Sequence, residues 1–320
     1  MNSNYRTLWG EDTSEIGEGK EYRGYRHKWH TYPKDGTVAD FPLFLDIEAS
    51  AYCNLRCPHC IQTDSQFEKG IMPMDMFQRV IDEASDNGCY GCKFHTIGRG
   101  EPLTNPWLPK MIAYAKKKGL IDVYLNTNGV LLSASIWRGP LLDAGLDRIS
   151  ISVDGLGEDY NRYRSGGNFW ALTETVERFF NLRNVFGYKT KIRIQTVDLG
   201  FSLEYLERYA RYWSLWCDEV GVVKFKDMVN RKYGVKDSWI CPQPWQRMSV
   251  LWDGSILPCN HDDRQYARLG TFPEMSLKKA WHGPGMRLIR EAYRRGQGHF
   301  IGACDGCFLR TSEIKGGKGK

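Results

Sequence analysis

The chain has 320 residues, of which 42% are hydrophobic and 13% aromatic, and its 44 basic and 38 acidic side chains give a formal net charge of +6. A chain of this size and composition can bury a substantial core, which excludes general disorder and predicts one large domain or two unequal domains. Interleaved charges disfavour binding to nucleic acid, and the lack of an apolar run of roughly 20 residues or of a signal-peptide core disfavours a membrane, so we expect a soluble cytoplasmic protein.

Residues 1–40 are polar and show no sustained period, so we expect an extension that lies over the body of the protein. From Phe41 onward, short apolar segments alternate with segments of helical period. The strand-like segments are FPLFLDIE, CKFHTIG, IDVYLNTNG, LDRISISVDG, TKIRIQTVDL and EVGVVKF, and the helical ones include MFQRVIDEA, PWLPKMIAYAKKKG, WALTETVERFFNLRNVF and LEYLERYARYW.

This alternation predicts an α/β fold, in which residues 41–230 form a partial (β/α)6 barrel of parallel strands with right-handed crossovers. Six units leave such a barrel open. Functional groups gather at the carboxyl ends of parallel strands, so we expect one rim of polar residues there. The rim segments are Cys53, Gly98 to Glu101, Asn126 to Gly129, Ser152 to Gly155, Gln195 to Asp198, and Lys224 to Asp227.

After about residue 230 the alternation stops, and Trp, Pro, Gly and Cys become frequent. This change predicts a second, smaller domain over residues 231–310 that is stabilised by a bound metal or cluster. Residues 311–320, which end in KGGKGK, are expected to be a disordered tail.

The segment CNLRCPHC places Cys53, Cys57 and Cys60 in a loop directly after the first strand. Without a sign of secretion, the ten cysteines are better explained by metal or iron–sulfur ligation than by disulfides. Three thiolates suit a cubane cluster that keeps one iron without a protein ligand. A redox pair of Cys57 and Cys60, or part of a zinc site, is the alternative.

The cysteine spacing resembles the signature of the radical S-adenosylmethionine (SAM) superfamily, whose fold is a partial barrel of six units. The resemblance implies that the open iron chelates the amino and carboxylate groups of SAM. It further implies reductive cleavage of SAM to methionine and a 5′-deoxyadenosyl radical, with a flavodoxin or ferredoxin-type protein as the electron donor.

The same resemblance implies SAM-binding roles for residues at other strand ends. In GRGEP, the glycines allow close backbone approach and Glu101 receives the methionine ammonium. Ser152 would bond the ribose, and Arg164 would pair with the SAM carboxylate; a helix cap and a surface arginine are the alternatives. His59 occupies the place of a ring near the adenine, unless it is an ordinary loop histidine. The expected SAM contacts are His59, Gly98, Gly100, Glu101, Asn128, Ser152, Arg164 and Gln195.

A second cysteine set, Cys241, Cys259, Cys304 and Cys307, lies near the C-terminus. Four thiolates can enclose a cluster completely. Structural zinc is the alternative, although four-cysteine zinc sites usually have two Cys-x-x-Cys pairs and this set has one. The phrases CPQPW, GSILPC and CDGC resemble the SPASM/twitch extension of the superfamily, which implies one auxiliary cluster. The expected cofactors are therefore two [4Fe–4S] clusters and SAM.

The single auxiliary cluster resembles the pattern of dehydrogenases of the type that oxidises an aminocyclitol alcohol in butirosin biosynthesis. It implies hydrogen abstraction from a sugar-like small molecule, with the auxiliary cluster accepting an electron. Radical epimerisation of a sugar or peptide is the alternative, and a non-catalytic iron–sulfur binding protein is a remote one. Epimerases need a hydrogen-atom donor, and the spare thiols Cys89, Cys92 and Cys217 are expected in the core near the amino ends of strands, which favours oxidation.

Oxidation of an alcohol also releases a proton, so a base is needed near the reacting carbon. Lys224, Lys226 and Asp227, at the end of the sixth strand, are the candidate catalytic residues. Forty polar residues are too few to fold as a separate leader-peptide recognition domain, which disfavours a peptide substrate.

Overall fold

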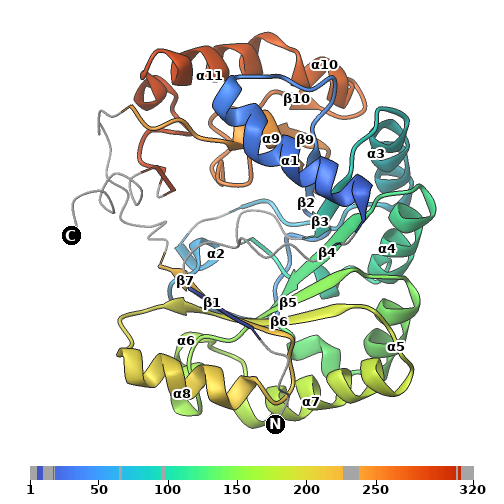
Figure 1. The fold of residues 1–320 in the computed structure, drawn as a ribbon, viewed down its shortest axis with the longest axis vertical. Helices are drawn as coiled ribbons and strands as arrows, with labels where there is room; N and C mark the ends of the chain where they lie inside the picture. Colours follow the sequence, from blue (N-terminus) through green and yellow to red (C-terminus); the bar gives the residue numbers. More distant parts are fainter. Residues whose placement is uncertain are drawn as a thin grey trace.

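The computed structural model describes residues 6–9, 17, 19–64, 67–94, 99–225, 238–307 and 309–310. In this part of the chain, ten strands form one sheet in the order β1-β7-β6-β5-β4-β3-β2-β8-β9-β10 (Figure 1). The pairs from β2 to β7 are all parallel. These six strands are β2 (Phe44–Ile47), β3 (Gly91–Phe94), β4 (Asp122–Thr127), β5 (Arg148–Ser152), β6 (Lys191–Asp198) and β7 (Glu219–Lys224).

Helices between the strands form an outer arc around the sheet, from α3 to α8 (Figure 1). The α/β fold predicted from the alternation of strands and helices is therefore confirmed. The connecting elements are α2 (Ile61–Asp64), α3 (Met74–Asp86), η1 (Pro102–Thr104), α4 (Leu108–Lys117), η2 (Val130–Ser133), α5 (Ser135–Asp143), α6 (Glu158–Tyr163), α7 (Phe169–Val185) and α8 (Leu203–Trp213).

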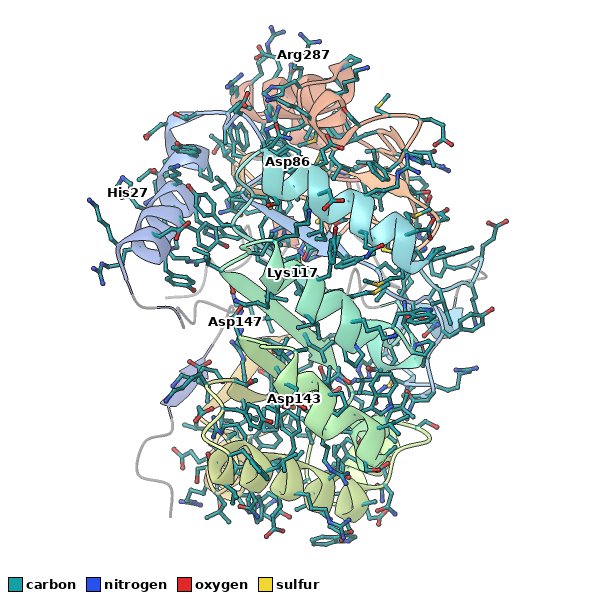
Figure 2. All side chains as sticks on the ribbon, turned by 90° about the vertical axis from the view of Figure 1, so that its right-hand side faces the viewer. His27, Asp86, Lys117, Asp143, Asp147 and Arg287 are labelled. Carbon is teal, nitrogen blue, oxygen red and sulfur yellow. The ribbon has the colours of Figure 1, made fainter. Side chains whose placement is uncertain are left out.

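Charged side chains lie on the outer surface of these helices. Asp86, Lys117 and Asp143 lie exposed on α3, α4 and α5 (Figure 2). Within the described residues, no helix combines the length and the apolar character that crossing a membrane requires.

The two faces of the sheet differ in polarity. In β5, Ile149 and Ile151 are fully buried in the main apolar core. Arg148, Ser150 and Ser152 alternate with them and therefore project from the opposite, inner face. The inner face is thus polar although it is largely buried, and this is where a polar ligand would be accommodated.

Paired charges occupy the amino-terminal half of the inner face. Asp46 is fully buried, and its carboxylate lies 3.2 Å from Lys93 Nζ and 3.4 Å from an Arg247 nitrogen. The guanidinium of Arg148 stacks 4.2 Å from the centre of the Tyr124 ring. Buried charges are tolerated when they are paired in this way, so this half of the inner face is a closed structural layer.

The N-terminal region differs from the expected polar extension. Helix α1 (Lys20–Asp35) buries Tyr22 and Tyr25, and Trp29 meets Phe44 of β2 edge to face at 5.9 Å. Tyr25 Oη also lies 3.3 Å from Asp122 Oδ2. The aromatic residues recur at helical spacing, but the basic residues between them obscured the period. Strand β1 (Arg6–Trp9) adds to β7 in parallel.

The C-terminal region continues the same sheet. Strand β8 (Arg247–Val250) pairs with β2 in parallel, and β9 (Ser255–Leu257) and β10 (Gly270–Thr271) follow in antiparallel order. The helical elements of this region are α9 (Gln243–Gln246), α10 (Leu277–Trp281), α11 (Pro284–Arg294) and η3 (Gly298–Phe300). The expected tail, residues 311–320, lies outside the described residues.

Candidate functional site

The loop after β2 brings three thiols together at the carboxyl end of the sheet. Burial raises the pKa of Cys53 to about 11, and the neighbouring thiols of Cys57 and Cys60 contribute in the same direction. Cys57 is 7% exposed, and burial raises the pKa of both other thiols as well. Neighbouring thiols disfavour one another's ionisation because their negative charges would repel. A bound cation offsets this repulsion, so the thiolates become favourable ligands.

The glycine-rich segment packs directly on this cysteine loop. Gly100 has φ +70°, and a Cβ at this position would meet Ser50 O at 1.9 Å, so the backbone there requires glycine. The next residue, Glu101, donates its N–H to Tyr52 O at 2.6 Å. Gly98, the other glycine expected to contact SAM, lies outside the described residues. The turn and the loop therefore form one unit.

Glu101 connects this unit to the end of β4. Its buried carboxylate accepts hydrogen bonds from Thr127 Oγ1 at 2.6 Å, Asn128 N at 2.7 Å and Leu103 N at 3.1 Å. Burial raises the pKa of Glu101, and these donors oppose the shift. Asn128 Nδ2 then donates to Asn54 Oδ1 in the cysteine loop at 2.9 Å. The structure thus gives Glu101 an internal orienting role that the sequence did not suggest.

Asp154, at the end of β5, is a site residue that the sequence interpretation missed. Its fully buried Oδ2 lies 3.2 Å from His59 Nε2 and 2.6 Å from Arg164 Nε, and Val197 N donates to its Oδ1 at 2.9 Å. Burial would raise the pKa of Asp154, but Arg164 and then His59 outweigh it and hold the pKa at about 2. A lone acidic residue directly after an apolar strand was the available signal.

Asp154 changes the interpretation of its two partners. The side chain of Arg164 is 14% exposed, so the surface-arginine alternative is wrong. His59 lies among rings, edge to face with Tyr163 at 6.4 Å and with Phe225 at 6.5 Å. A buried anion therefore orients both residues that were expected to contact SAM.

The other predicted rim residues fall at the ends of β5, β6 and β7. Ser152 and Gln195 are partners in the β5–β6 register and are half-buried. Helix α6 has Gly157 as its N-cap, so Ser152 is not a helix cap. Lys224 is exposed at the end of β7. The other two candidate bases, Lys226 and Asp227, lie outside the described residues.

The four C-terminal cysteines form a second group beside α11. Burial raises the pKa of Cys241, and Cys304 and Cys307 raise it further. Burial also raises the pKa of Cys259, and the other three thiols raise it further. Burial also raises the pKa of Cys304, to about 12, while a hydrogen bond from Tyr293 opposes the shift. Residues separated widely in sequence therefore share one buried site.

The thiol chemistry of both cysteine groups suits an iron–sulfur cluster, because soft thiolates are its usual ligands. Within the described residues, no group of three or more His, Cys, Asp or Glu side chains is arranged to hold one metal ion. The four ligands of a zinc ion converge on one point, with each sulfur about 2.3 Å from the metal. A cubane instead binds its thiolates at separate corners, which requires a wider spacing.

Replacement of Asp154 by asparagine tests the role of the buried anion. Asn keeps the shape but leaves Arg164 buried without a counter-charge, so we expect a loss of about 3–5 kcal/mol in the free energy of unfolding by urea. Glu174→Gln, which removes an exposed ion pair with Arg178, is the control and should change stability by less than about 1 kcal/mol. Because the pKa of Asp154 is lowered, its contribution persists at neutral pH and disappears as the pH falls from about 4 toward 2. Equal stability of the two variants would contradict this role.

Two family models match the chain. The model described as the radical SAM superfamily matches residues 47–212, which is more than half of the chain. The model described as SPASM, an iron–sulfur cluster-binding domain, matches residues 241–308. Each match contains one of the two cysteine groups.

Curated relatives cover different shares of the chain. A probable GTP 3′,8-cyclase of Methanococcus maripaludis is 33% identical over 128 residues, 39% of this chain and 41% of the cyclase. The chain thus spans about two fifths of the cyclase's length. A tungsten-containing aldehyde ferredoxin oxidoreductase cofactor-modifying protein of Pyrococcus furiosus is 24% identical, over 84% of this chain and 88% of that protein.

Solved structures share the fold at low identity. BtrN in complex with AdoMet and 2-DOIA has a TM-score of 0.52 and 17% identity, over 85% of this chain and 93% of that chain. Native anSMEcpe with bound AdoMet has a TM-score of 0.63 and 18% identity, over 86% and 95%. SuiB of Streptococcus suis bound to the precursor peptide SuiA has a TM-score of 0.63 and 16% identity, over 88% and 74%.

Proposed function

Because this chain belongs to the radical SAM superfamily and carries a SPASM iron–sulfur cluster-binding domain, we propose that it oxidises an alcohol group of a polar, sugar-like or aminocyclitol-like small molecule. The packing of the cysteine loop on the Gly100–Glu101 turn supports the SAM site on which the proposal rests. When bound, two [4Fe–4S] clusters and SAM supply the 5′-deoxyadenosyl radical and an acceptor for the electron that the substrate loses.

We assign the cysteines of the loop to the SAM-binding cluster and the C-terminal set to the auxiliary cluster. The first ligand set is Cys53, Cys57 and Cys60, and the second is Cys241, Cys259, Cys304 and Cys307. The buried thiols of each set support the assignment, because ligation to iron offsets the cost of burying thiolate charge.

The surrounding residues hold SAM in our proposal. Gly100 leaves room for the SAM amino acid against the backbone, and Glu101 fixes the turn from beneath. Asp154 orients Arg164, whose remaining N–H groups are available to the SAM carboxylate. Ser152 and Gln195 on the neighbouring strands bond the ribose, with Asn128 and His59 completing the set.

The inner face of the sheet supports a hydroxylated substrate. Ser150 on β5 lies one layer nearer the rim than the paired charges and is 2% exposed, and in the described part of the chain its hydroxyl oxygen has no hydrogen-bond partner. Unpaired buried hydroxyls are costly, and a polar ligand would satisfy them. When the alcohol loses a hydrogen atom and an electron, its hydroxyl proton must also leave. The proposed bases for this proton are Lys224 and, nearby in sequence, Lys226 and Asp227.

The spare thiols support oxidation over epimerisation. Cys89 Sγ lies 3.6 Å from Leu43 O and 3.4 Å from Gly91 O, before the amino end of β3. Cys92 and Cys217 are completely buried in the main core. None of the three lies on the rim, where a thiol would have to return a hydrogen atom to the substrate radical.

An anaerobic assay with dithionite and SAM tests the proposal. Protein reconstituted to about eight irons per chain should form 5′-deoxyadenosine, and with a panel of sugars and aminocyclitols in deuterated water it should release a product two hydrogens lighter than the substrate. Solvent deuterium retained at a carbon would instead indicate epimerisation. No 5′-deoxyadenosine from the two-cluster protein would overturn the proposal.

A further inference from the structure

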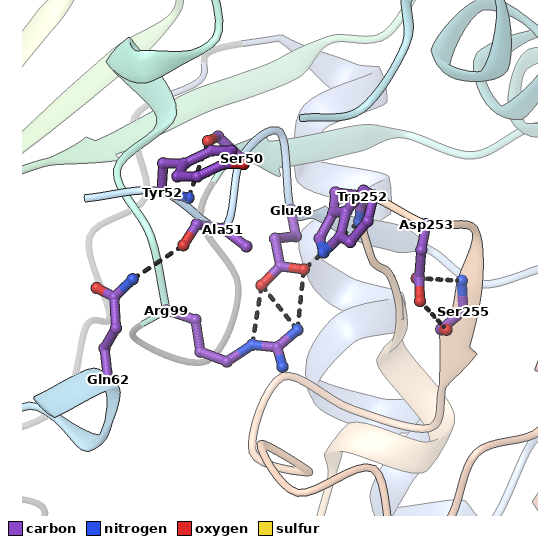
Figure 3. A network of polar contacts seen from close by, with 9 residues as sticks. All are labelled: Glu48, Ser50, Ala51, Tyr52, Gln62, Arg99, Trp252, Asp253 and Ser255. Atoms are coloured by element: carbon purple, nitrogen blue, oxygen red, sulfur yellow. Dashed lines mark hydrogen bonds and ion pairs between the residues drawn. The ribbon is translucent and has the colours of Figure 1, made fainter. Parts of the chain in front are cut away.

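A buried carboxylate joins three segments of the site at one point (Figure 3). Glu48 directly follows β2 and is 1% exposed. Its Oε1 accepts a hydrogen bond from Arg99 Nε at 2.9 Å, and its Oε2 accepts from Arg99 Nη2 at 2.9 Å. Trp252 N, between β8 and β9, lies 3.4 Å from the same Oε2. The contact therefore links the barrel, the glycine-rich segment and the C-terminal region.

The Glu48–Arg99 contact is a bidentate ion pair, which is strongly directional. A guanidinium fork that meets both carboxylate oxygens fixes orientation as well as distance. Arg99 is 2% exposed, and its guanidinium lies 4.7 Å from the centre of the Phe67 ring. Burial raises the pKa of Glu48, and Arg99 is the leading group that opposes this shift. Each member is therefore needed to keep the other charged and buried.

The backbone on either side of this pair belongs to the candidate SAM site. Arg99 immediately precedes Gly100, so the fork fixes the start of the turn that packs on the cysteine loop. Glu48 N also donates to Val250 O of β8 at 2.9 Å. The ring of Trp252 lies on Gly70, where a Cβ would come within 2.2 Å of it. The C-terminal region is thus attached close to both motifs.

We propose that Glu48 is a positioning residue that ties the glycine-rich turn, through Arg99, and the C-terminal domain, through Trp252, to the first strand of the barrel. The inference rests on the proposed function, because the turn is assigned to SAM binding. Displacement of a binding turn by a fraction of an ångström weakens ligand binding even when the fold persists. The pair therefore acts on SAM affinity without touching SAM.

The dissociation constant for SAM, measured by anaerobic calorimetry on the two-cluster protein, tests this proposal. Arg99→Gln and Glu48→Gln should each weaken SAM binding about tenfold or more. The double variant should be no weaker than the worse single variant, because the two side chains act as a unit. Glu174→Gln is the control: Glu174 forms an exposed ion pair with Arg178 within α7. It should stay within about twofold of the wild type.

Arg99→Lys separates positioning from folding. Lysine keeps the buried charge but cannot form the fork, so the variant should retain its iron and melting temperature and still lose SAM affinity. Wild-type affinity in Arg99→Lys and Arg99→Gln would overturn the positioning role, as would additive losses in the double variant. A wild-type protein that binds two clusters but no SAM would instead overturn the proposed function itself.

Discussion

Replacing Cys57 with alanine should halve the iron content of the reconstituted protein, from about eight to about four atoms per chain. It should also reduce 5′-deoxyadenosine formation to background. Cys57 is the most deeply buried thiol of the loop, and two remaining thiolates cannot hold a cubane at three corners. Iron analysis and an anaerobic assay with dithionite and SAM check both results.

Cys89→Ala is the matched control for this variant. Its thiol is about as buried, packs in the main apolar core and contacts the main-chain oxygens of Leu43 and Gly91, near the amino end of β3 and away from the rim. This variant should keep both clusters and its ability to cleave SAM. If Cys57→Ala retained full iron and still formed 5′-deoxyadenosine, the assignment of the loop thiols would be wrong.

Replacing Cys259 with alanine should separate SAM cleavage from substrate oxidation. We expect about four irons per chain and 5′-deoxyadenosine formation within about threefold of the wild type, because the first cluster lies in a separate segment. Formation of the oxidised product should fall to background, since the electron that the substrate loses would have no acceptor. Mass analysis of the product checks this result alongside the iron content.

Zinc analysis of the wild type and of this variant completes the test. One zinc per wild-type chain with about four irons, and loss of that zinc in Cys259→Ala, would show that the C-terminal thiols hold zinc. The auxiliary-cluster assignment would then fail, while the assignment of the loop thiols would stand.

The sequence predicted the fold well because the decisive signals are local. The strands of residues 41–230 are short apolar runs separated by helical segments, and their parallel order follows from that alternation. The rim could be predicted for the same reason, since each strand end is marked in the sequence. Cys53, Glu101 and Ser152 lie at or after strand ends, as the alternation predicted, while their roles stay predictions.

Contacts between distant segments could not be predicted. The pairing of Glu48 with Arg99 spans 51 positions and depends on where two strand ends meet. Asp154 lay within the predicted rim segment Ser152 to Gly155, but its contacts with His59 and Arg164 could not be predicted. The sequence interpretation missed helix α1. The helix packs through a few aromatic residues, but its many basic residues make the segment polar on average and hid the helical period.

The pairing of β8 with β2 has a consequence for the order in which the protein is made. Arg247 and Asp46, on these two strands, are 201 positions apart, so the edge of β2 stays open until most of the chain has left the ribosome. The barrel edge at β2 can therefore be completed only after the C-terminal region has been synthesised.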